Sequence, residues 1–190
     1  GALHVDFGGN FATFCGWVIE PNAQIYLVAG NPIQAQEATV WLRRVGLDAS
    51  PGYLDGAMFA WSKVGLPTAH IRQLDAEEVN AAARGEMKMA IVDVRAPSEF
   101  AQQHIQNAIN IPAPELRTRF KELDPKLPTL LICGTGHRSS LGASLLKQRG
   151  FEDVYNAAGG MSGYAAAGFS PECPVCVVPH GPRFIEKKIG

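Results

Sequence analysis

Residues 129–150, TLLICGTGHRSSLGASLLKQRG, join an apolar run, a glycine-containing turn and an amphipathic segment. The apolar run ends at Cys133, and the amphipathic segment ends at Gly150. Within that segment the leucines recur at helical spacing: Leu141, Leu145 and Leu146. An apolar run bounded by turn residues is typical of a buried strand, and a glycine after an amphipathic segment is typical of a helix end. The stretch therefore predicts a buried strand, a tight turn and a helix.

The same order of elements occurs earlier in the chain. Aligning Cys133 with Ala29 places TLLICGTG over IYLVAGNP, the sequence of residues 25–32. Downstream positions then match as well: Leu42 with Leu146, Gly46 with Gly150, and Gly56 with Gly160. Each copy reads as a strand, a turn, a helix, a second short strand and a glycine-containing turn. This order predicts an α/β fold with a parallel sheet, and the internal similarity predicts two related units.

Further elements are predicted upstream of the second copy. Asp75 and Glu78 have the spacing of a capping box, so we expect a helix to begin after Asp75. The β-branched run MAIVDV at 89–94 predicts a strand. PSEFAQQHI at 97–105 predicts a short helix, and AINIP at 108–112 predicts another strand.

The two copies divide the chain into regions. These are a partial, inactive unit at residues 1–65 (the first unit), a complete unit at residues 66–172 (the second unit) and a C-terminal tail at residues 173–190. In the first unit GALHVDF, residues 1–7, corresponds to NAINIP and predicts a strand. The counterpart of residues 74–105 would then precede Gly1. Residues 62–73, with a glycine and a proline, predict the linker between the units.

The composition excludes several classes of partner. The 190 residues carry a formal net charge of −1, and basic residues cluster only in the closing IEKKIG, which argues against nucleic acid and anionic lipid. No apolar run approaches the roughly 20 residues of a membrane-spanning helix. Four unevenly spaced cysteines do not make a secreted disulfide framework. We therefore expect a cytoplasmic protein with a small-molecule or protein-thiol substrate, and neither a nucleic-acid nor a membrane partner.

Cys133 lies where a strand ends and a helix begins, the edge at which open α/β sheets place ligands. Gly134 and Gly136 permit backbone angles at which successive amides converge on one point. The helix N-terminus and Arg138 add positive charge, which favours a thiolate over a thiol. A cysteine that only fills space has no need of these neighbours. We therefore favour a nucleophile in an anion-binding loop over a buried packing residue.

The length of the loop separates two chemistries that use such a site. Tyrosine-type phosphatases have the pattern Cys-x5-Arg, whereas this chain has Cys133-x4-Arg138. The shorter loop leaves room for one sulfur atom on the cysteine and less room for a phosphoryl group. A cysteine-dependent phosphatase or arsenate reductase is therefore the less favoured alternative.

Residues 74–168 resemble a rhodanese domain, which belongs to a family of sulfurtransferases. The motifs that carry the resemblance occur in the family's order: IVDVR with Glu99 and Phe100, HIQNAINIP, the Cys-x-x-Gly-x-Arg-Ser loop, and AGGMSGY. The resemblance implies a three-layer α/β/α fold around a central parallel sheet. It also implies transfer of sulfane sulfur from thiosulfate or a low-molecular-weight persulfide to cyanide, sulfite or a thiol, through a persulfide on Cys133 and without a cofactor. A persulfide-binding sensor module is the alternative.

The site residues follow from the loop and the resemblance. Cys133 is the expected catalytic nucleophile. The loop residues expected to bind substrate are Gly134, Thr135, Gly136, His137, Arg138 and Ser139. By resemblance Asp93 and Arg95 are structural supports, and they pair with each other, with Glu99 or with the loop. The role of His137 stays open between steering substrate, carrying a proton and being merely solvated.

The first unit resembles the second half of a rhodanese with Ala29 at the cysteine position, so it cannot form a persulfide. GGNFATFCGWVI, ahead of Ala29, is similar to bacterial fusions in which a metallo-β-lactamase-like persulfide dioxygenase precedes tandem rhodanese units. The resemblance implies a fused N-terminal hydrolase-like domain outside this chain. This sequence itself contains no metal-binding histidine motif of that domain, and we expect no metal in the site.

The remaining cysteines have other interpretations. Cys173 and Cys176 form a Cys-x2-Cys pair, which supplies two ligands where a closed zinc site needs four. His180 is a possible third ligand, and metal binding, disulfide exchange and an inert tail all stay open. Cys15 is predicted to pack in the core, as is Trp41 on the stripe of the first amphipathic helix.

Overall fold

The computed structural model describes residues 1–48 and 52–171. Cys173, Cys176 and His180 lie outside these residues, so the alternatives for the tail stay predictions. The first unit contains α1 (Phe11–Val18), β1 (Tyr26–Leu27), α2 (Pro32–Arg43), β2 (Gly52–Tyr53) and α3 (Ala57–Lys63). The second unit contains β3 (Arg72–Leu74), α4 (Ala76–Ala83), β4 (Ala90–Asp93), α5 (Pro97–Gln102), β5 (Ala108–Asn110), α6 (Ala113–Arg119), the 3-10 helix η1 (Phe120–Glu122), β6 (Thr129–Ile132), α7 (His137–Gln148), β7 (Val154–Ala157) and α8 (Gly160–Ala166).

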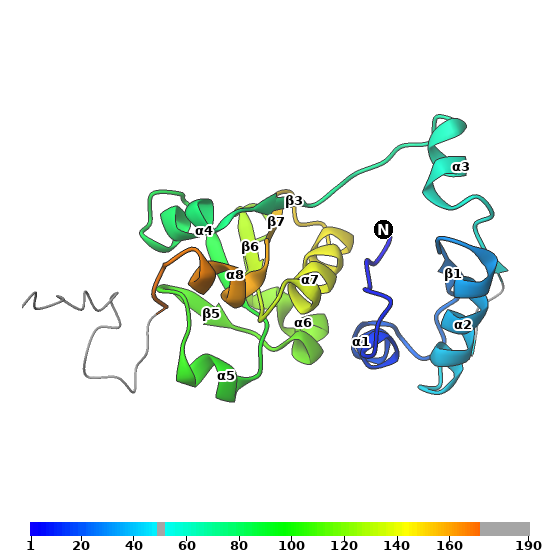
Figure 1. Cartoon of the computed structure of the whole chain (residues 1–190), viewed down its shortest axis with the longest axis horizontal. Coiled ribbons are helices and arrows are strands. Elements are labelled where there is room, and N and C mark those ends of the chain that lie inside the picture. Colours follow the sequence, from blue (N-terminus) through cyan, green and yellow to red (C-terminus); the bar gives the residue numbers. More distant parts are fainter. Residues whose placement is uncertain (49–51, 172–190) are drawn as a thin grey trace, which may run out of the picture.

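The second unit is built on a five-stranded parallel sheet in the order β3-β7-β6-β4-β5. Helices α6 and α7 cover one face of this sheet, and α4 and α8 cover the other (Figure 1). The central strand β6 is buried along its whole length. Its Leu131 packs toward α6 and α7, while Leu130 and Ile132 pack toward α4 and α8. Burial on both faces explains the unbroken apolar run, and the expected three-layer α/β fold is confirmed.

The structure of the second unit contains the helix start and helix end that local sequence signals predicted. Asp75 and Glu78 form a reciprocal capping box at the start of α4, in which each side chain accepts a hydrogen bond from the other residue's backbone N–H. Helix α7 ends before Gly150, whose φ of +90° is the left-handed conformation that glycine adopts without strain. These signals are local, which is why a sequence pattern is enough to find them.

The first unit repeats the strand, helix, strand order on a smaller scale. Strands β1 and β2 form a two-stranded parallel sheet in which Tyr26 pairs with Gly52. The side chain of Asn31 caps α2 by accepting a hydrogen bond from the backbone N–H of Gln34 at 2.9 Å, and Pro32 occupies the first turn. Helix α2 buries Leu42 completely, but Trp41 is 44% exposed, with Arg44 stacked over its ring. The prediction that Trp41 packs in the core is wrong.

Two other predictions for the first unit are corrected. Residues 1–7 form no strand, because they lie beside α7 of the second unit and their polar groups bond to its side chains rather than to a sheet. The predicted match of Gly56 with Gly160 is shifted by one position. Gly56 (φ +73°) and Gly159 (φ +69°) both precede a helix in the left-handed conformation, so Ala57 (φ +51°) is the counterpart of Gly160 (φ +57°).

Helix α1 joins the two units, because its two sides are buried in different clusters (Figure 1). Phe14 and Val18 pack with α6 and α7, whereas Phe11 and Cys15 pack with α2. Burial raises the pKa of the Cys15 thiol to about 11, so this thiol stays protonated at neutral pH. Cys15 therefore packs in the core, as predicted.

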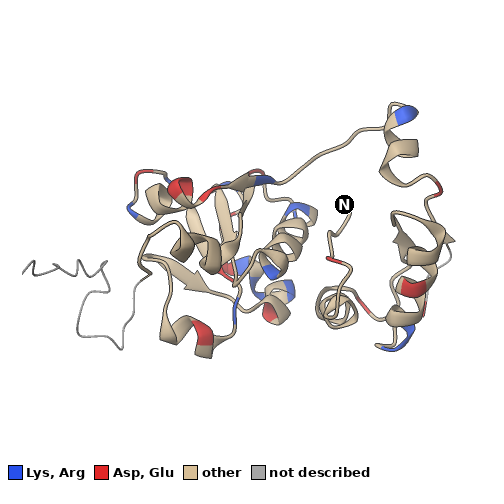
Figure 2. Ribbon diagram, viewed as in Figure 1, with Lys and Arg blue, Asp and Glu red and all other residues tan. Residues whose placement is uncertain are grey.

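Acidic and basic residues are interspersed over the described elements of both units (Figure 2). Within the described ranges, every helix is too short or too polar to cross a membrane.

Candidate active site

Cys133 directly follows β6 and is 1% exposed. Its Sγ atom accepts hydrogen bonds from the backbone N–H of Gly136 at 3.2 Å and from the hydroxyl of Ser139 at 3.3 Å. Gly136 has a φ of +102°, which a residue with a side chain rarely adopts. The loop thus curls over the sulfur and directs two donors at it.

The N-terminus of α7 lies immediately behind the sulfur. This helix begins at His137, is 12 residues long and carries neither an N-terminal side-chain cap nor an acidic residue in its first turn. Its first N–H groups and its dipole are therefore available to an anion at the loop. Gly136 is the one loop amide within hydrogen-bond distance of Sγ in the described structure, so the predicted wider ring of amides stays a prediction. Thr135 and His137 lie on the exposed side of the loop.

The start of α8 holds the loop from the other side. The backbone N–H of Met161 donates to the carbonyl of Cys133 at 2.7 Å, and that of Ser162 donates to the carbonyl of Gly134 at 3.0 Å. A Cβ atom on Gly160 would lie 2.4 Å from the Cys133 carbonyl oxygen, so this approach requires glycine. The sequence contained this residue within AGGMSGY, but nothing in its pattern showed that it touches the cysteine loop.

Arg138 is bound by Glu99 of α5 rather than directed at the sulfur. Its two terminal nitrogens donate to the two carboxylate oxygens at 2.7 and 2.9 Å. The hydrogen bonds from Arg138 lower the pKa of Glu99 to about 2, and the same pairing raises the pKa of Arg138. The ion pair ties the loop to α5, and the described contacts of Arg138 are those of a loop anchor.

Asp93 and Arg95 pair with each other beneath the site. Both are buried, at 0% and 4% exposure, and the Asp93 carboxylate accepts hydrogen bonds from Nε and Nη2 of Arg95, the latter at 2.6 Å. Arg95 also donates to the carbonyl of Gln103 at 2.6 Å. The side-chain amide of Asn110, which the sequence did not single out, donates to the backbone carbonyls of Asp93 and Arg95. This network fixes the carboxyl ends of β4 and β5 next to the loop.

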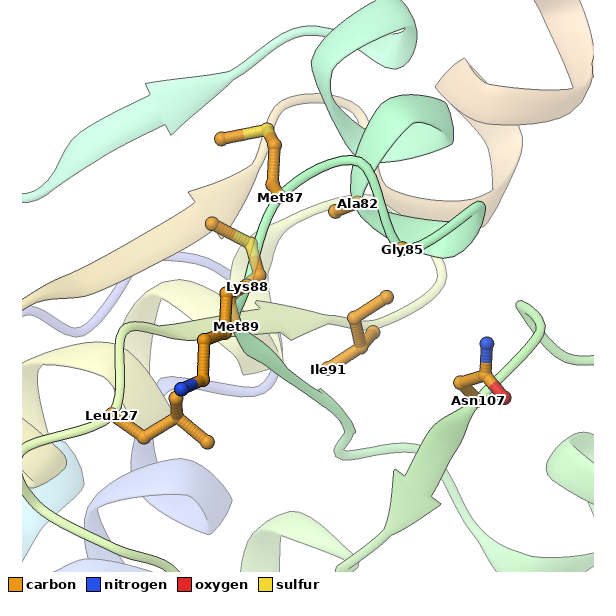
Figure 3. Close-up of a pocket in the computed structure, with 8 residues that line it drawn as sticks. All are labelled: Ala82, Gly85, Met87, Lys88, Met89, Ile91, Asn107 and Leu127. Atoms are coloured by element: carbon orange, nitrogen blue, oxygen red, sulfur yellow. The ribbon is translucent and has the colours of Figure 1, made fainter.

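A pocket of about 290 Å³ lies elsewhere in the second unit (Figure 3). Its lining residues are Ala82, Gly85, Met87, Lys88, Met89, Ile91, Asn107 and Leu127. Most of them precede or begin β4, β5 and β6, whereas Cys133 follows β6. The amino ends and the carboxyl ends of parallel strands lie on opposite sides of the sheet, so this pocket is separate from the cysteine loop.

Comparison with known proteins agrees with the fold of the second unit. The model of the rhodanese-like domain family matches residues 75–167. The uncharacterized protein YqhL of Bacillus subtilis is 37% identical over 90 residues, which are 47% of this chain and 69% of that protein. The thiosulfate sulfurtransferase PspE of Escherichia coli is 37% identical over 70 residues, which are 36% of this chain and 67% of that protein.

A solved structure is similar as well. The solution NMR structure of the rhodanese-like domain from the Alr3790 protein of Anabaena sp. is 25% identical, with a TM-score of 0.51, and the match covers 59% of this chain and 87% of that one. Because the relatives share the sequence of the second unit and the similar structure shares its fold, this chain belongs to the rhodanese-like family.

Proposed function

We propose that the chain is a sulfurtransferase that moves sulfane sulfur from thiosulfate or a low-molecular-weight persulfide to a thiophilic acceptor through a persulfide on Cys133. One observation carries the proposal: the buried Sγ atom accepts hydrogen bonds from Gly136 and Ser139 at the N-terminus of α7. Donors and a helix dipole directed at one sulfur stabilise a thiolate and, one atom further out, a persulfide anion. The similarity to a thiosulfate sulfurtransferase of Escherichia coli supports the same reaction class.

The reaction is a double displacement. In the first step the Cys133 thiolate attacks the outer sulfur of thiosulfate, a new S–S bond forms, and the bond to the inner sulfur breaks as sulfite leaves with the electron pair. In the second step an acceptor such as cyanide attacks the outer sulfur of the persulfide. Thiocyanate forms and the Cys133 thiolate is regenerated. Sulfite or a thiolate would accept the sulfur in the same way.

The neighbouring residues have distinct proposed roles. The N–H of Gly136 and the hydroxyl of Ser139 stabilise negative charge on the sulfur, and Gly134 and Thr135 shape the loop around the incoming donor. Arg138, held by Glu99, fixes the loop, and the Asp93–Arg95 pair supports it from below. His137, on the exposed side, meets the substrate first. Because its four cysteines are too few and too unevenly spaced for a secreted disulfide framework, we also assign the protein to the cytoplasm. By resemblance we assign its first unit to a tandem arrangement fused to a hydrolase-like domain.

Cyanide-dependent release of thiocyanate from thiosulfate tests the proposal. We expect wild-type turnover and background rates for Cys133→Ser, while the matched variant Cys15→Ser, which changes the other buried cysteine in the described chain, keeps its activity. Mass spectrometry of the protein incubated with thiosulfate should show one added sulfur, about 32 Da, on the Cys133 peptide.

Two alternative results would overturn the proposal. Persulfide formation without turnover would identify a sensor module. Hydrolysis of an aryl phosphate without sulfur transfer would identify a phosphatase.

A further inference from the structure

Residues 1–7 of the first unit form an extended segment, the N-terminal strap, along α7. The contacts follow one face of the helix from its end to its start. Gln148 donates to the carbonyl of Gly1 at 3.0 Å, the N–H of His4 donates to the hydroxyl of Ser144 at 3.0 Å, Nδ1 of His4 lies 2.9 Å from the hydroxyl of Ser140, and Oδ2 of Asp6 lies 3.5 Å from Nδ1 of His137. The strap therefore ends beside the cysteine loop.

Apolar packing fixes the position of the strap. Leu3 and Val5 pack against the hydrophobic cluster formed with α6 and α7, and α1 continues into the same cluster through Phe14 and Val18. The hydrogen bonds of His4, which lies between Leu3 and Val5, hold the segment on α7. Asp6 is thus placed at the start of α7 by the residues on either side of it.

The arginines near the cysteine loop are already paired with carboxylates, so the Asp6 charge has no arginine partner among the described contacts. Arg138 is paired with Glu99, and Arg95 with Asp93, so both arginines near the loop are compensated by carboxylates. Asp6 and His137 are 52% and 55% exposed, and His137 is the first residue of α7, directly after the cysteine loop. The Asp6 carboxylate therefore adds negative charge on the exposed side of the loop, which we call the entrance, and its described partner there is the His137 imidazole.

We propose that Asp6, supplied by the inactive first unit, is a specificity-determining residue that selects sulfur donors of low negative charge for Cys133. This inference rests on the proposed sulfurtransferase function. A carboxylate at the entrance repels a dianion more than a monoanion, and the difference grows as the donor approaches the sulfur. The first unit thus acts on the reaction through one charge, although it has no cysteine in its own loop.

Two donors isolate this effect. Thiosulfate is a dianion, and methanethiosulfonate replaces one of its oxygens by a methyl group and is a monoanion. Both donate the same outer sulfur to the Cys133 thiolate, with sulfite or methanesulfinate as the leaving group. The ratio of kcat/KM for thiosulfate to kcat/KM for methanethiosulfonate therefore reports the charge at the entrance.

The test measures this ratio for the full chain and five variants. Asp6→Asn should raise the ratio by about two- to fivefold, the size expected for one surface charge within about a nanometre. The gain should shrink at about 0.5 M salt. Asp6→Glu, which keeps the charge, and Glu37→Gln, which removes an exposed carboxylate from α2, should leave the ratio as in wild type. In a His137→Gln background, where Asp6 has no imidazole partner, Asp6→Asn should raise the ratio at least as much.

Three results would overturn the inference: an unchanged ratio in Asp6→Asn, an equal shift in Asp6→Glu, or a shift that does not respond to salt. The rate of Cys133 persulfide formation in a single turnover, followed by mass spectrometry, gives the same donor ratio without an acceptor. Loss of turnover with intact, donor-selective persulfide formation would therefore contradict the proposed enzyme function but not the role of Asp6. Absence of persulfide formation with either donor would contradict both.

Discussion

The loops that follow β1 and β6 have the same place in the two units but use their hydrogen-bond donors differently. After β1, the N–H of Gly30 donates to the side chain of Gln34 at 2.7 Å, and the N–H of Gln34 donates to Asn31 at 2.9 Å. Pro32 has no N–H to give. After β6, the helix has no side-chain cap and the N–H of Gly136 donates to the Cys133 sulfur. The first loop completes its own helix cap, whereas the second leaves donors for a ligand.

The last helices of the two units, α8 and α3, also differ in how they contact the preceding loop. In the second unit, Gly160 allows α8 to approach the loop, and Met161 bonds to the Cys133 carbonyl. In the first unit, Ala57 occupies the place of Gly160, and no corresponding bond from α3 to the carbonyl of Ala29 occurs among the described residues. The comparison shows that a reactive loop needs support from both sides, in addition to the cysteine.

The largest expected effect removes support at the end of β4, a neighbour of β6 that has no counterpart beside β1 in the described structure. Asp93→Asn leaves the Arg95 guanidinium buried without a counter-charge and should lower the free energy of unfolding by about 3–5 kcal/mol. Urea denaturation measures this loss. Asp55→Asn, at an exposed position of the first unit, should change it by less than about 0.5 kcal/mol. A loss below about 1 kcal/mol for Asp93→Asn would show that the ion pair is not what supports the loop.

Gly160→Ala tests the contact between α8 and the loop. The added Cβ would lie 2.4 Å from the Cys133 carbonyl oxygen at a φ of +57°, so the loop must shift. We expect a loss of about 2–3 kcal/mol in the free energy of unfolding, and about a hundredfold loss of sulfur transfer from the displaced sulfur. The matched variant Ala57→Gly should be neutral or slightly stabilising, because Ala57 has a φ of +51°. Full activity in Gly160→Ala would show that the contact between α8 and the loop is not needed to position the sulfur.

What the sequence could predict depended on how local each signal was. The strand, turn and helix around Cys133 came from leucine spacing and a terminal glycine, and the start of α4 came from two residues three positions apart. The pairing of Asp93 with Arg95, two positions apart, was one of the alternatives that the sequence left open. The pairing of Arg138 with Glu99 was beyond such reasoning, because the fold brings α5 next to the loop. Residues 1–7 have the alternating pattern of a strand. A strand forms only beside another strand, and these residues instead pack and hydrogen-bond along α7.

A smaller effect is expected at the loop anchor. The pKa of Glu99 is about 2 in the folded chain and 4.5 in its ordinary range, so its ion pair contributes stability above about pH 4.5 and loses it as the pH falls toward 2. The carboxylate is 38% exposed, which limits the contribution to below about 1 kcal/mol. The difference in free energy of unfolding between wild type and Glu99→Gln should therefore shrink over this pH range. A difference that stays constant would point to a cause other than the ion pair with Arg138.

The smallest expected effect is the sharpest test of the comparison between the loops. Ala29→Cys in a Cys133→Ser background places a thiol where the first unit has a methyl group, but the N–H groups of Gly30 and Gln34 remain bound to side chains and Pro32 still lacks one. The new thiol should therefore gain no sulfur from thiosulfate, as measured by mass spectrometry of its peptide. Alkylation with iodoacetamide provides the control, because it shows that the thiol is accessible. Sulfur uptake at a rate near that of Cys133 would mean that the cysteine alone makes the site, and that the donors and the α8 contact are incidental.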